Sequence, residues 1–366
     1  MSTLDEGEAN RILCCDVGSL PCSQDMNKFL EGSGQLITDS AEYFENTIVK
    51  TFLEKLKAGV SVPAFPQFRD MNEMFLSIFE GLEKIKGGYV ATKRLALKSE
   101  SRTLPEVEAI KRNMKKISDQ MCCPFKLRVC ITGPYTLSSF FPYRNSETYT
   151  QLGQVLSQIV EKSIFAEKEG RTFLISIDEP LFGMVDDPLI DRGTEGREAL
   201  LKAWETMAHQ AKTRNVESCI HLHYTSDDLF WTIKSLQIVE SHTDDPLYEM
   251  KATKQRLDDA DKFLKASIAV TDFDKLIWNR LGSKASDEAV GDAWKRISTG
   301  GVDPQEFFED INVMEKRLHR VIEQFGLERV ALAGTECGLR GFPNYGSAIQ
   351  YLGLVSKAVK HGCQRC

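Results

Sequence analysis

The sequence predicts a (β/α)8 barrel, and three observations lead to this fold class. Eight short apolar runs occur along the 366 residues, and each is followed by a stretch with helical periodicity. The runs are nearly continuous rather than strictly alternating, as expected for parallel strands that helices cover. No Gly-x-Gly-x-x-Gly pattern follows the first run, which argues against a doubly wound sheet, the main alternative. Eight strand–helix units therefore favour the barrel.

The predicted elements alternate in the order that a barrel requires. The first strand, "RILCCDVGS", precedes an amphipathic helix that ends at Gly59, a residue that suits a helix C-cap. The predicted strands cover residues 11–19, 60–65, 126–133, 172–179, 216–223, 235–241, 265–273 and 329–336. The predicted helices cover residues 40–59, about 71–84, 146–169, 195–214, 252–264, 304–325 and 346–361, with a short helix after the fifth strand.

Two polar segments interrupt this alternation. Residues 86–125 and 275–301 are charged and contain Gly, Ser and Lys. We expect them to be insertions that act as lids on the barrel. Length alone suggests about two domains, but α/β barrels often exceed about 200 residues as one domain. Residues 1–366 are therefore predicted to form a single barrel domain.

The composition limits the class of protein. The chain is 42% apolar and 27% charged, with a net charge of -7 and a pI near 5.6. Nucleic-acid binding is not expected, because it usually requires a basic face. The sequence has no long apolar span of the kind that predicts a membrane segment. Its acidic N-terminus does not resemble a signal peptide. Ten cysteines in a chain of this length do not form a disulfide scaffold, which indicates a cytoplasmic protein.

The segment "CIHLHYTSDD" contains two of the six histidines of the chain. Side chains at positions i and i+2 of a strand point to the same face, so His221 and His223 are expected to lie side by side. Two adjacent imidazoles are a natural half of a metal site. Two half-buried or surface histidines at a strand end are the alternative interpretation.

Further polar residues follow the other predicted strands, and in a barrel the carboxyl ends of the strands meet at one rim. Taken singly, each has a structural alternative, such as a turn, a helix cap or a core cysteine. Together, two imidazoles, one carboxylate and one thiolate after the fifth, sixth and eighth strands are the ligand types that zinc prefers. These rim residues are Asp16, Ser19, Gln67, Asp178, Glu179, His221, His223, Glu240, His242, Asp272, Asp274, Glu336 and Cys337.

An ordered set of segments spanning nearly the whole chain resembles the catalytic barrel of cobalamin-independent methionine synthase. The wider superfamily includes zinc thiol methyltransferases and uroporphyrinogen decarboxylase. "IDEP" and "CGLR" are the most specific pieces of the resemblance. The resembling segments are "DVGSLP", "PQFRDMNEMF", "ITGPYTLSSFF", "ISIDEPLF", "CIHLHYTSDD", "IVES" and "AGTECGLRG".

The resemblance implies a zinc ion that binds the substrate thiol as a thiolate. The implied zinc ligands are His221, His223, Glu240 and Cys337. By the same resemblance, the amino-acid part of homocysteine is held by Asp178, the acid of IDEP, and by Ser19, with a contact from Gln67.

The chain departs from the family pattern at two positions. His223 stands where the family has a cysteine ligand; a register shift would instead pair His223 with Thr225, but Thr is a poor zinc ligand. The family also has a proton-donating histidine after the seventh strand, where this chain offers Asp272 or Asp274.

The short chain resembles core versions of the enzyme. The resemblance implies methyl transfer to homocysteine from a methylated corrinoid protein or a folate-type donor. Three alternatives stay open at this point. They are alkyl transfer to another thiol such as coenzyme M, a metal-free decarboxylase, and a degenerate barrel that binds a partner.

Overall fold

The computed structural model describes residues 12–22, 25–34, 38–99 and 103–364. The acidic N-terminus and Arg11, where the first strand was predicted to begin, lie outside these residues. The strands are β1 Leu13–Cys15, β2 Phe79–Ile85, β3 Gly88–Leu97, β4 Phe125–Thr132, β5 Gly170–Glu179, β6 Glu217–Leu222, β7 Ile238–Glu240, β8 Phe263–Ala269 and β9 Val330–Thr335. The helices are α1 Met26–Ser33, α2 Asp39–Lys57, α3 Glu73–Leu76, α4 Pro105–Arg112, α5 Met114–Met121, α6 Pro134–Ser138, α7 Ser146–Ser163, α8 Glu195–Lys212, α9 Lys251–Asp259, α10 Phe273–Leu281, α11 Asp287–Ser298, α12 Ile311–Phe325 and α13 Tyr345–Gln364.

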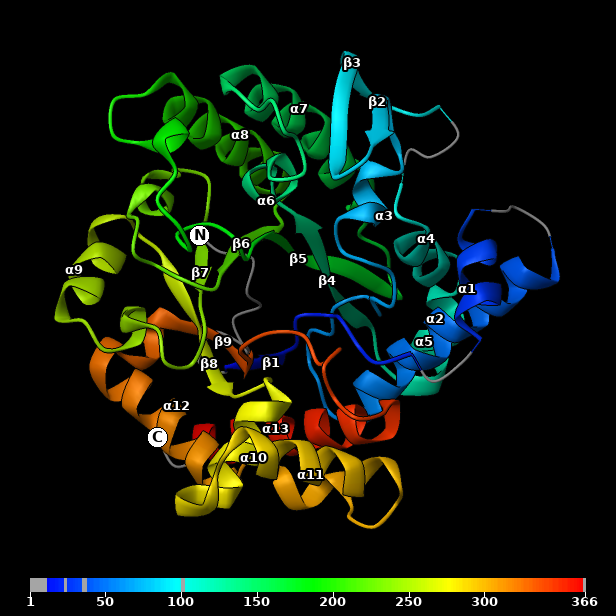
Figure 1. The fold of residues 1–366 in the computed structure, drawn as a ribbon, viewed down its shortest axis with the longest axis vertical. Coiled ribbons are helices and arrows are strands. Elements are labelled where there is room, and N and C mark those ends of the chain that lie inside the picture. Colours follow the sequence, from blue (N-terminus) through cyan, green and yellow to red (C-terminus); the bar gives the residue numbers. More distant parts are fainter. Residues whose placement is uncertain (1–11, 23–24, 35–37, 100–102, 365–366) are drawn as a thin grey trace.

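Seven parallel strands form one curved sheet in the order β1-β9-β8-β7-β6-β5-β4, and helices surround it (Figure 1). The second predicted strand, residues 60–65, bridges the remaining gap. Its Val62 pairs with Cys15 of β1, and its Ala64 pairs with Arg128 of β4. The predicted barrel is therefore confirmed, with a second strand that makes only isolated bridges.

The predicted helix over residues 71–84 is wrong in most of its length. Only α3 is helical there, and the rest forms β2, which pairs antiparallel with β3. The turn between them consists of Lys86 and Gly87, and Gly88 begins β3; the φ angles of the two glycines are +90° and +157°. Such values suit a tight hairpin. The Lys86-Gly87-Gly88 segment was the sequence signal for this hairpin, and the prediction of a helix over residues 71–84 did not use it.

The two predicted insertions are built from regular elements. Residues 86–125 contain β3, α4 and α5, and residues 275–301 contain most of α10 and all of α11. In Figure 1 the β2–β3 hairpin and the α10–α11 pair lie at the periphery of the ring of helices. Their role as lids stays a prediction.

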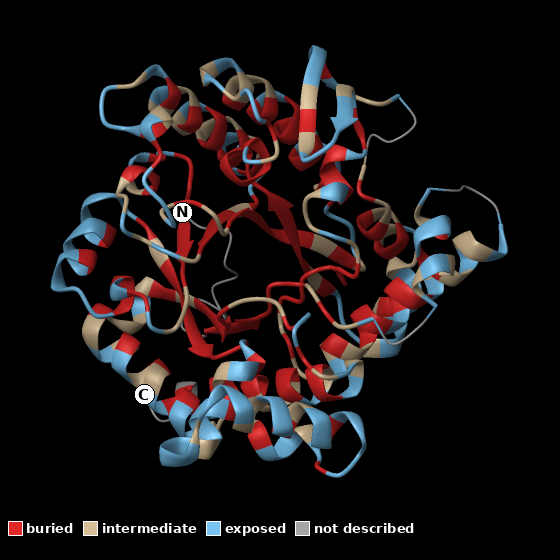
Figure 2. Ribbon diagram, viewed as in Figure 1, coloured by how far each residue is buried: buried red, intermediate tan, exposed pale blue. Residues whose placement is uncertain are grey.

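Apolar side chains pack both outside and inside the barrel. The larger cluster lies where the helices cover the strands, so the seven strands of the barrel sheet are almost entirely buried while the outer helix faces are exposed (Figure 2). A smaller cluster joins residues from facing strands, including Cys15, Leu174, Cys219 and Leu332. Among the described residues, no helix combines the length and the apolar character needed to cross a membrane.

A buried ion pair supports the irregular second strand. The Nζ atom of Lys55, on α2, lies 2.7 Å from Oδ2 of Asp16 and also donates to the carbonyl oxygen of Ala64. The other Asp16 oxygen accepts a hydrogen bond from the Ala64 amide at 2.8 Å. One carboxylate and one ammonium group thus join α2, β1 and residues 60–65.

We predict that Lys55→Ala destabilises the fold, because it leaves the Asp16 carboxylate buried without its cation. Breaking a buried pair in this way costs about 3–5 kcal/mol. Urea unfolding measures the loss. Lys50→Ala, at an exposed position of α2, is the matched control and should change the free energy of unfolding by about 0.5 kcal/mol or less. Equal effects of the two substitutions would contradict the proposed support.

Candidate metal centre

Four neighbouring strands place one polar layer at their carboxyl ends. Thr132 of β4 is in register with Asp178 of β5, which is in register with His221 of β6. His221 is in turn in register with Glu240 of β7. Residues in register on parallel strands share a face, and all four are buried. The layer therefore lines the interior of the barrel.

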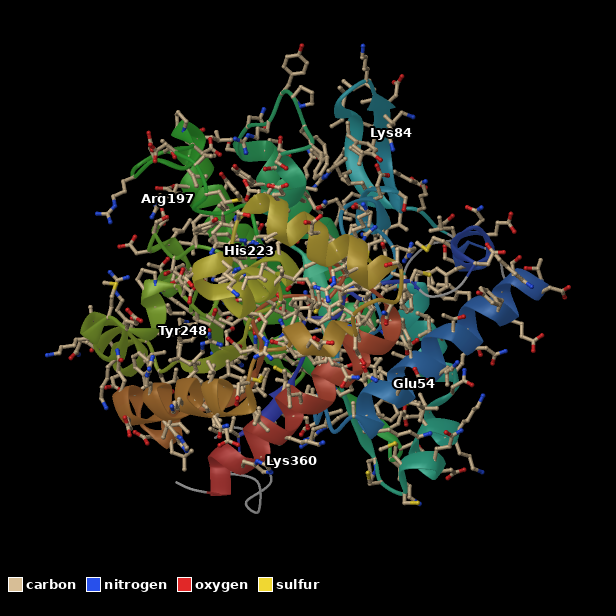
Figure 3. All side chains as sticks on the ribbon, turned by 60° about the horizontal axis from the view of Figure 1, so that its bottom comes forward. Glu54, Lys84, Arg197, His223, Tyr248 and Lys360 are labelled. Atoms are coloured by element: carbon tan, nitrogen blue, oxygen red, sulfur yellow. The ribbon has the colours of Figure 1, made fainter. Side chains whose placement is uncertain are left out.

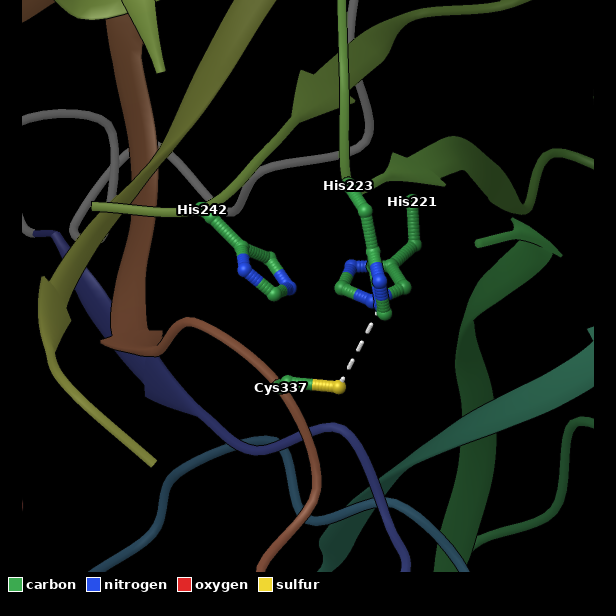
Figure 4. A group of neighbouring side chains, drawn as sticks. All are labelled: His221, His223, His242 and Cys337. Atoms are coloured by element: carbon green, nitrogen blue, oxygen red, sulfur yellow. Dashed lines mark hydrogen bonds between the residues drawn. The ribbon is translucent and has the colours of Figure 1, made fainter. Parts of the chain in front are cut away.

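His221 of this layer and three further side chains could together hold a metal ion. One nitrogen or sulfur atom from each of His221, His223, His242 and Cys337 lies within 4.8 Å of the others (Figure 4). The Sγ atom of Cys337 lies 3.5 Å from Nε2 of His223. In the view of Figure 3, His223 lies near the centre of the molecule, whereas Lys84 and Lys360 lie at its periphery.

The alternation argument for the histidine pair agrees with this geometry. The rings of His221 and His223 are 5.4 Å apart between centroids, and the ring of His242 lies 4.1 Å from that of His223. Three of the six histidines of the chain thus meet at one point. His242 was recognised in the sequence as a rim residue but was not chosen as a ligand.

The electrostatics of the cluster favour an anionic cysteine. Burial opposes ionisation of Cys337, but the three neighbouring imidazoles hold its thiol pKa well below the usual range. Burial also opposes protonation of His221, yet Cys337 and Glu240 raise the pKa of this histidine to about 9. Burial lowers the pKa of His223. The cluster thus favours the thiolate that binds metal, and a bound ion would displace the proton from His221.

Unpartnered nitrogen atoms show that the residues fit a metal ion. Within the described part of the chain, both ring nitrogens of His221 and Nε2 of His242 are buried and have no hydrogen-bond partner. A buried polar atom without a partner costs about 1–3 kcal/mol, and coordination of a cation would remove this cost. Three imidazoles and one thiolate are a donor set that suits zinc.

Glu240, the predicted carboxylate ligand, lies outside this cluster. Its carboxylate forms a short, bidentate ion pair with Arg128 and lies 3.3 Å from Nζ of Lys265. His242 is the fourth member of the cluster. The carboxylate turns away because two buried cations from β4 and β8 attract it, and they keep its pKa well below the usual range despite burial.

The sequence did contain a signal for this arrangement. Arg128 and Lys265 stand inside the otherwise apolar runs "KLRVCIT" and "LKASIAV". Buried strands rarely carry unpaired charges, so each of these residues required an anionic partner inside the barrel. That requirement pointed to an acid on another strand.

The predicted substrate-binding residues lie in two places around the rim. Asp178 is next to His221 in the polar layer, accepts a 2.6 Å hydrogen bond from Ser176, and has a pKa that burial raises to about 6. Ser19 forms a bridge with Gln67. The Ser19 Oγ atom also packs so closely on Gly338 that a Cβ atom there would approach it to 1.8 Å.

Gly338 follows Cys337, so this contact places Ser19 beside the loop that carries the thiol. Gln67 is buried, and its Nε2 atom lies 3.3 Å from the sulfur of Met74. The structure thus places Ser19 and Gln67 together.

The two predicted acid residues after the seventh strand make structural contacts. Asp272 caps α10 by accepting a hydrogen bond from the amide of Lys275. Asp274 accepts a 2.5 Å hydrogen bond from the indole of Trp294. Neither carboxylate belongs to the histidine–cysteine cluster of the described residues. A proton-donating role for them stays a prediction.

Glu336 has a role that the sequence did not reveal. One of its oxygens accepts hydrogen bonds from the amide and the hydroxyl group of Thr243, at 2.9 and 2.7 Å. The other oxygen accepts from the amide of Thr271 at 2.9 Å. Because Thr243 follows His242 and Glu336 precedes Cys337, this carboxylate fixes the two loops that bring those donors together.

Neither a protein-family model nor a curated protein matches the sequence. Fold and site together define a (β/α)8 barrel with a candidate metal centre of imidazole and thiolate groups at the carboxyl ends of its strands.

Solved structures share this fold over nearly their full length. A B12-independent methionine synthase from Shewanella sp. W3-18-1, in complex with selenomethionine, is 12% identical with a TM-score of 0.63; the match covers 97% of this chain and 98% of that one. A putative vitamin-B12 independent methionine synthase from Listeria monocytogenes is 15% identical with a TM-score of 0.57, covering 96% and 98%. A methyltransferase from Methanosarcina mazei is 10% identical with a TM-score of 0.51, covering 97% and 96%. These likenesses confirm the resemblance at the level of the fold.

We predict that the protein binds one zinc ion per chain and that binding stabilises it. At free zinc of about 100 times the Kd, the free energy of unfolding should rise by about 2.7 kcal/mol. His242→Ala should weaken zinc binding. His209→Ala, at an exposed position of α8, is the control. Calorimetric titration and urea unfolding, with and without a chelator, measure both effects. A His242→Ala variant that binds zinc as tightly as the wild type would remove His242 from the donor set.

Proposed function

We propose that this protein is a zinc-dependent methyltransferase that methylates the thiol of homocysteine to form methionine. The observation that carries the proposal is the position of the cluster beside Asp178. The cluster offers His221, His223, His242 and Cys337 as metal donors at the carboxyl ends of barrel strands. In the next strand, Asp178 is in register with His221. A thiol and an ammonium group of one small amino acid can be recognised by these two neighbouring features.

Zinc bound by these residues would supply the chemistry of thiol activation, because it lowers the pKa of a coordinating thiol so that the nucleophilic thiolate forms at neutral pH. The residues of the chain supply orientation. Asp178 would pair with the ammonium group of homocysteine, and Ser19 and Gln67 would bind its carboxylate side. Holding the sulfur in line with the methyl group of a donor reduces the entropic part of the barrier.

Two properties of the structure support this proposal over the alternatives. A decarboxylase of tetrapyrroles needs free arginines in the barrel, but Arg128 is paired with Glu240 and Arg69 is paired with Glu106. A thiol that carries a sulfonate would also need a free cation near the cluster. Asp178 is an anion instead, which favours a substrate with an ammonium group.

The donor and the cellular location follow from the same proposal. We propose a methylated corrinoid protein or a folate-type molecule as the methyl donor, in the cytoplasm.

Zinc-edge X-ray absorption with and without homocysteine tests the proposed function. Cys337 is the only cysteine in the cluster of the described residues. We therefore expect one zinc–sulfur contact without homocysteine and two with it. A spectrum that homocysteine leaves unchanged would direct the search to other thiols. A purified protein that holds no zinc would overturn the proposal.

Asp178→Asn tests the amino-acid site. The variant should raise the KM for homocysteine about 10- to 100-fold, because a hydrogen bond to a charged group contributes about 1.5–3 kcal/mol. Zinc content should not change. Asp186→Asn, at an exposed position after the same strand, is the matched control. Steady-state assays with methylcobalamin as donor measure the KM of both variants. A normal KM in the Asp178 variant would place the ammonium group elsewhere.

A further inference from the structure

Glu240 contacts the cluster through one histidine. Its Oε1 atom lies 2.9 Å from Nδ1 of His221, and both residues are buried. With Nδ1 against the carboxylate, Nε2 is the nitrogen of His221 that can reach a shared metal ion. Neither ring nitrogen of His221 makes a hydrogen bond of regular geometry in the described structure, so the 2.9 Å approach of Glu240 alone distinguishes Nδ1 from Nε2.

A carboxylate at this position selects one form of the imidazole ring. A neutral imidazole has one N–H group and one nitrogen with a free lone pair, and an ionised carboxylate can only accept a hydrogen bond. Glu240 therefore favours the proton on Nδ1 of His221 and the lone pair on Nε2. The opposite form would place a nitrogen without a proton 2.9 Å from an anionic oxygen and would leave an N–H group facing the metal.

Two cations hold the carboxylate itself in place. Arg128 grips both of its oxygens from β4, and Lys265 lies 3.3 Å from Oε2 on the side of β8. All three side chains are fully buried. Movement of Glu240 into the cluster would separate it from both cations, so its position behind His221 is fixed by the fold.

We propose that Glu240 is a positioning residue of the metal centre rather than a ligand, and that His242 takes its place in the coordination sphere. Arg128 and Lys265 fix the carboxylate, the carboxylate fixes the ring form of His221, and His221 presents Nε2 to the metal. The proposal rests on the metal centre of the proposed function and deepens it.

Nitrogen NMR of the histidine rings tests the proposal on the wild-type protein. With only six histidines in the chain, selective 15N labelling resolves each ring, and His221→Gln assigns the signal of interest. We expect the metal-free and the zinc-loaded protein at a pH above 9 to carry the His221 proton on Nδ1. A proton on Nε2 in either state would overturn the proposal.

A matched pair of double variants gives a second test. Glu240→Leu/Lys265→Met and Glu240→Gln/Lys265→Met each remove one anion and one cation, so both keep the net charge of the buried group. Only the Gln variant keeps an oxygen that can accept the N–H of His221. We expect the Leu variant to bind zinc about 10- to 100-fold more weakly than the Gln variant, with the same number of coordinated imidazoles.

Two outcomes of this comparison would overturn the proposal. Equal zinc affinities in the pair would show that the acceptor has no effect. Loss of a carboxylate oxygen from the zinc coordination of both variants, relative to wild type, would show that Glu240 is a ligand. If the double variants do not fold, the NMR measurement decides alone.

These tests do not depend on catalysis. If homocysteine leaves the zinc spectrum unchanged while the His221 proton lies on Nδ1, the proposed substrate fails and the role of Glu240 stands. If homocysteine changes the zinc spectrum while the His221 proton lies on Nε2, the proposed substrate stands and the proposed role of Glu240 fails.

Discussion

The ion group of Arg128, Glu240 and Lys265 is the constraint on which the site depends. It crosses the interior of the barrel, since Arg128 comes from β4 and Glu240 from β7, with two strands between them in the sheet. Each charge would cost several kcal/mol if buried alone, so the three residues must remain together. Their geometry fixes the polar layer beneath the cluster and keeps Glu240 from joining the candidate metal ligands.

The candidate metal centre is held from two directions. From below, Glu240 contacts His221, which stands on a buried strand. From the rim, Glu336 binds Thr243 and Thr271 and so connects the loops next to His242 and Cys337. His221 thus comes from a strand, and the loops that carry His242 and Cys337 are held by a single buried carboxylate. A site held in this way is preorganised for its ion, because little movement is needed when the ion binds.

The buried charges next to the cluster balance one another. Arg128 and Lys265 face the Glu240 carboxylate, and the Asp178 carboxylate also interacts with Arg128. Two cations therefore match two carboxylates in this part of the described structure, and neither cation is left over for an anionic substrate group. The low dielectric of the interior strengthens these attractions and holds the group together.

The sequence by itself determined the barrel, the order of its strands, and the rim on which the polar residues meet. Apolar runs and helical periodicity are local properties, so strand–helix alternation and the pairing of His221 with His223 could be predicted. The prediction missed the β2–β3 hairpin because it followed a weak helical pattern over residues 71–84. In the structure, the glycines Gly87 and Gly88 at the hairpin turn outweigh that pattern. Only the tertiary structure decided that His242 and not Glu240 meets Cys337. That choice depends on Lys265 of the neighbouring strand β8 and on Arg128 of β4, which lies 112 residues before Glu240 and reaches it only when the barrel closes.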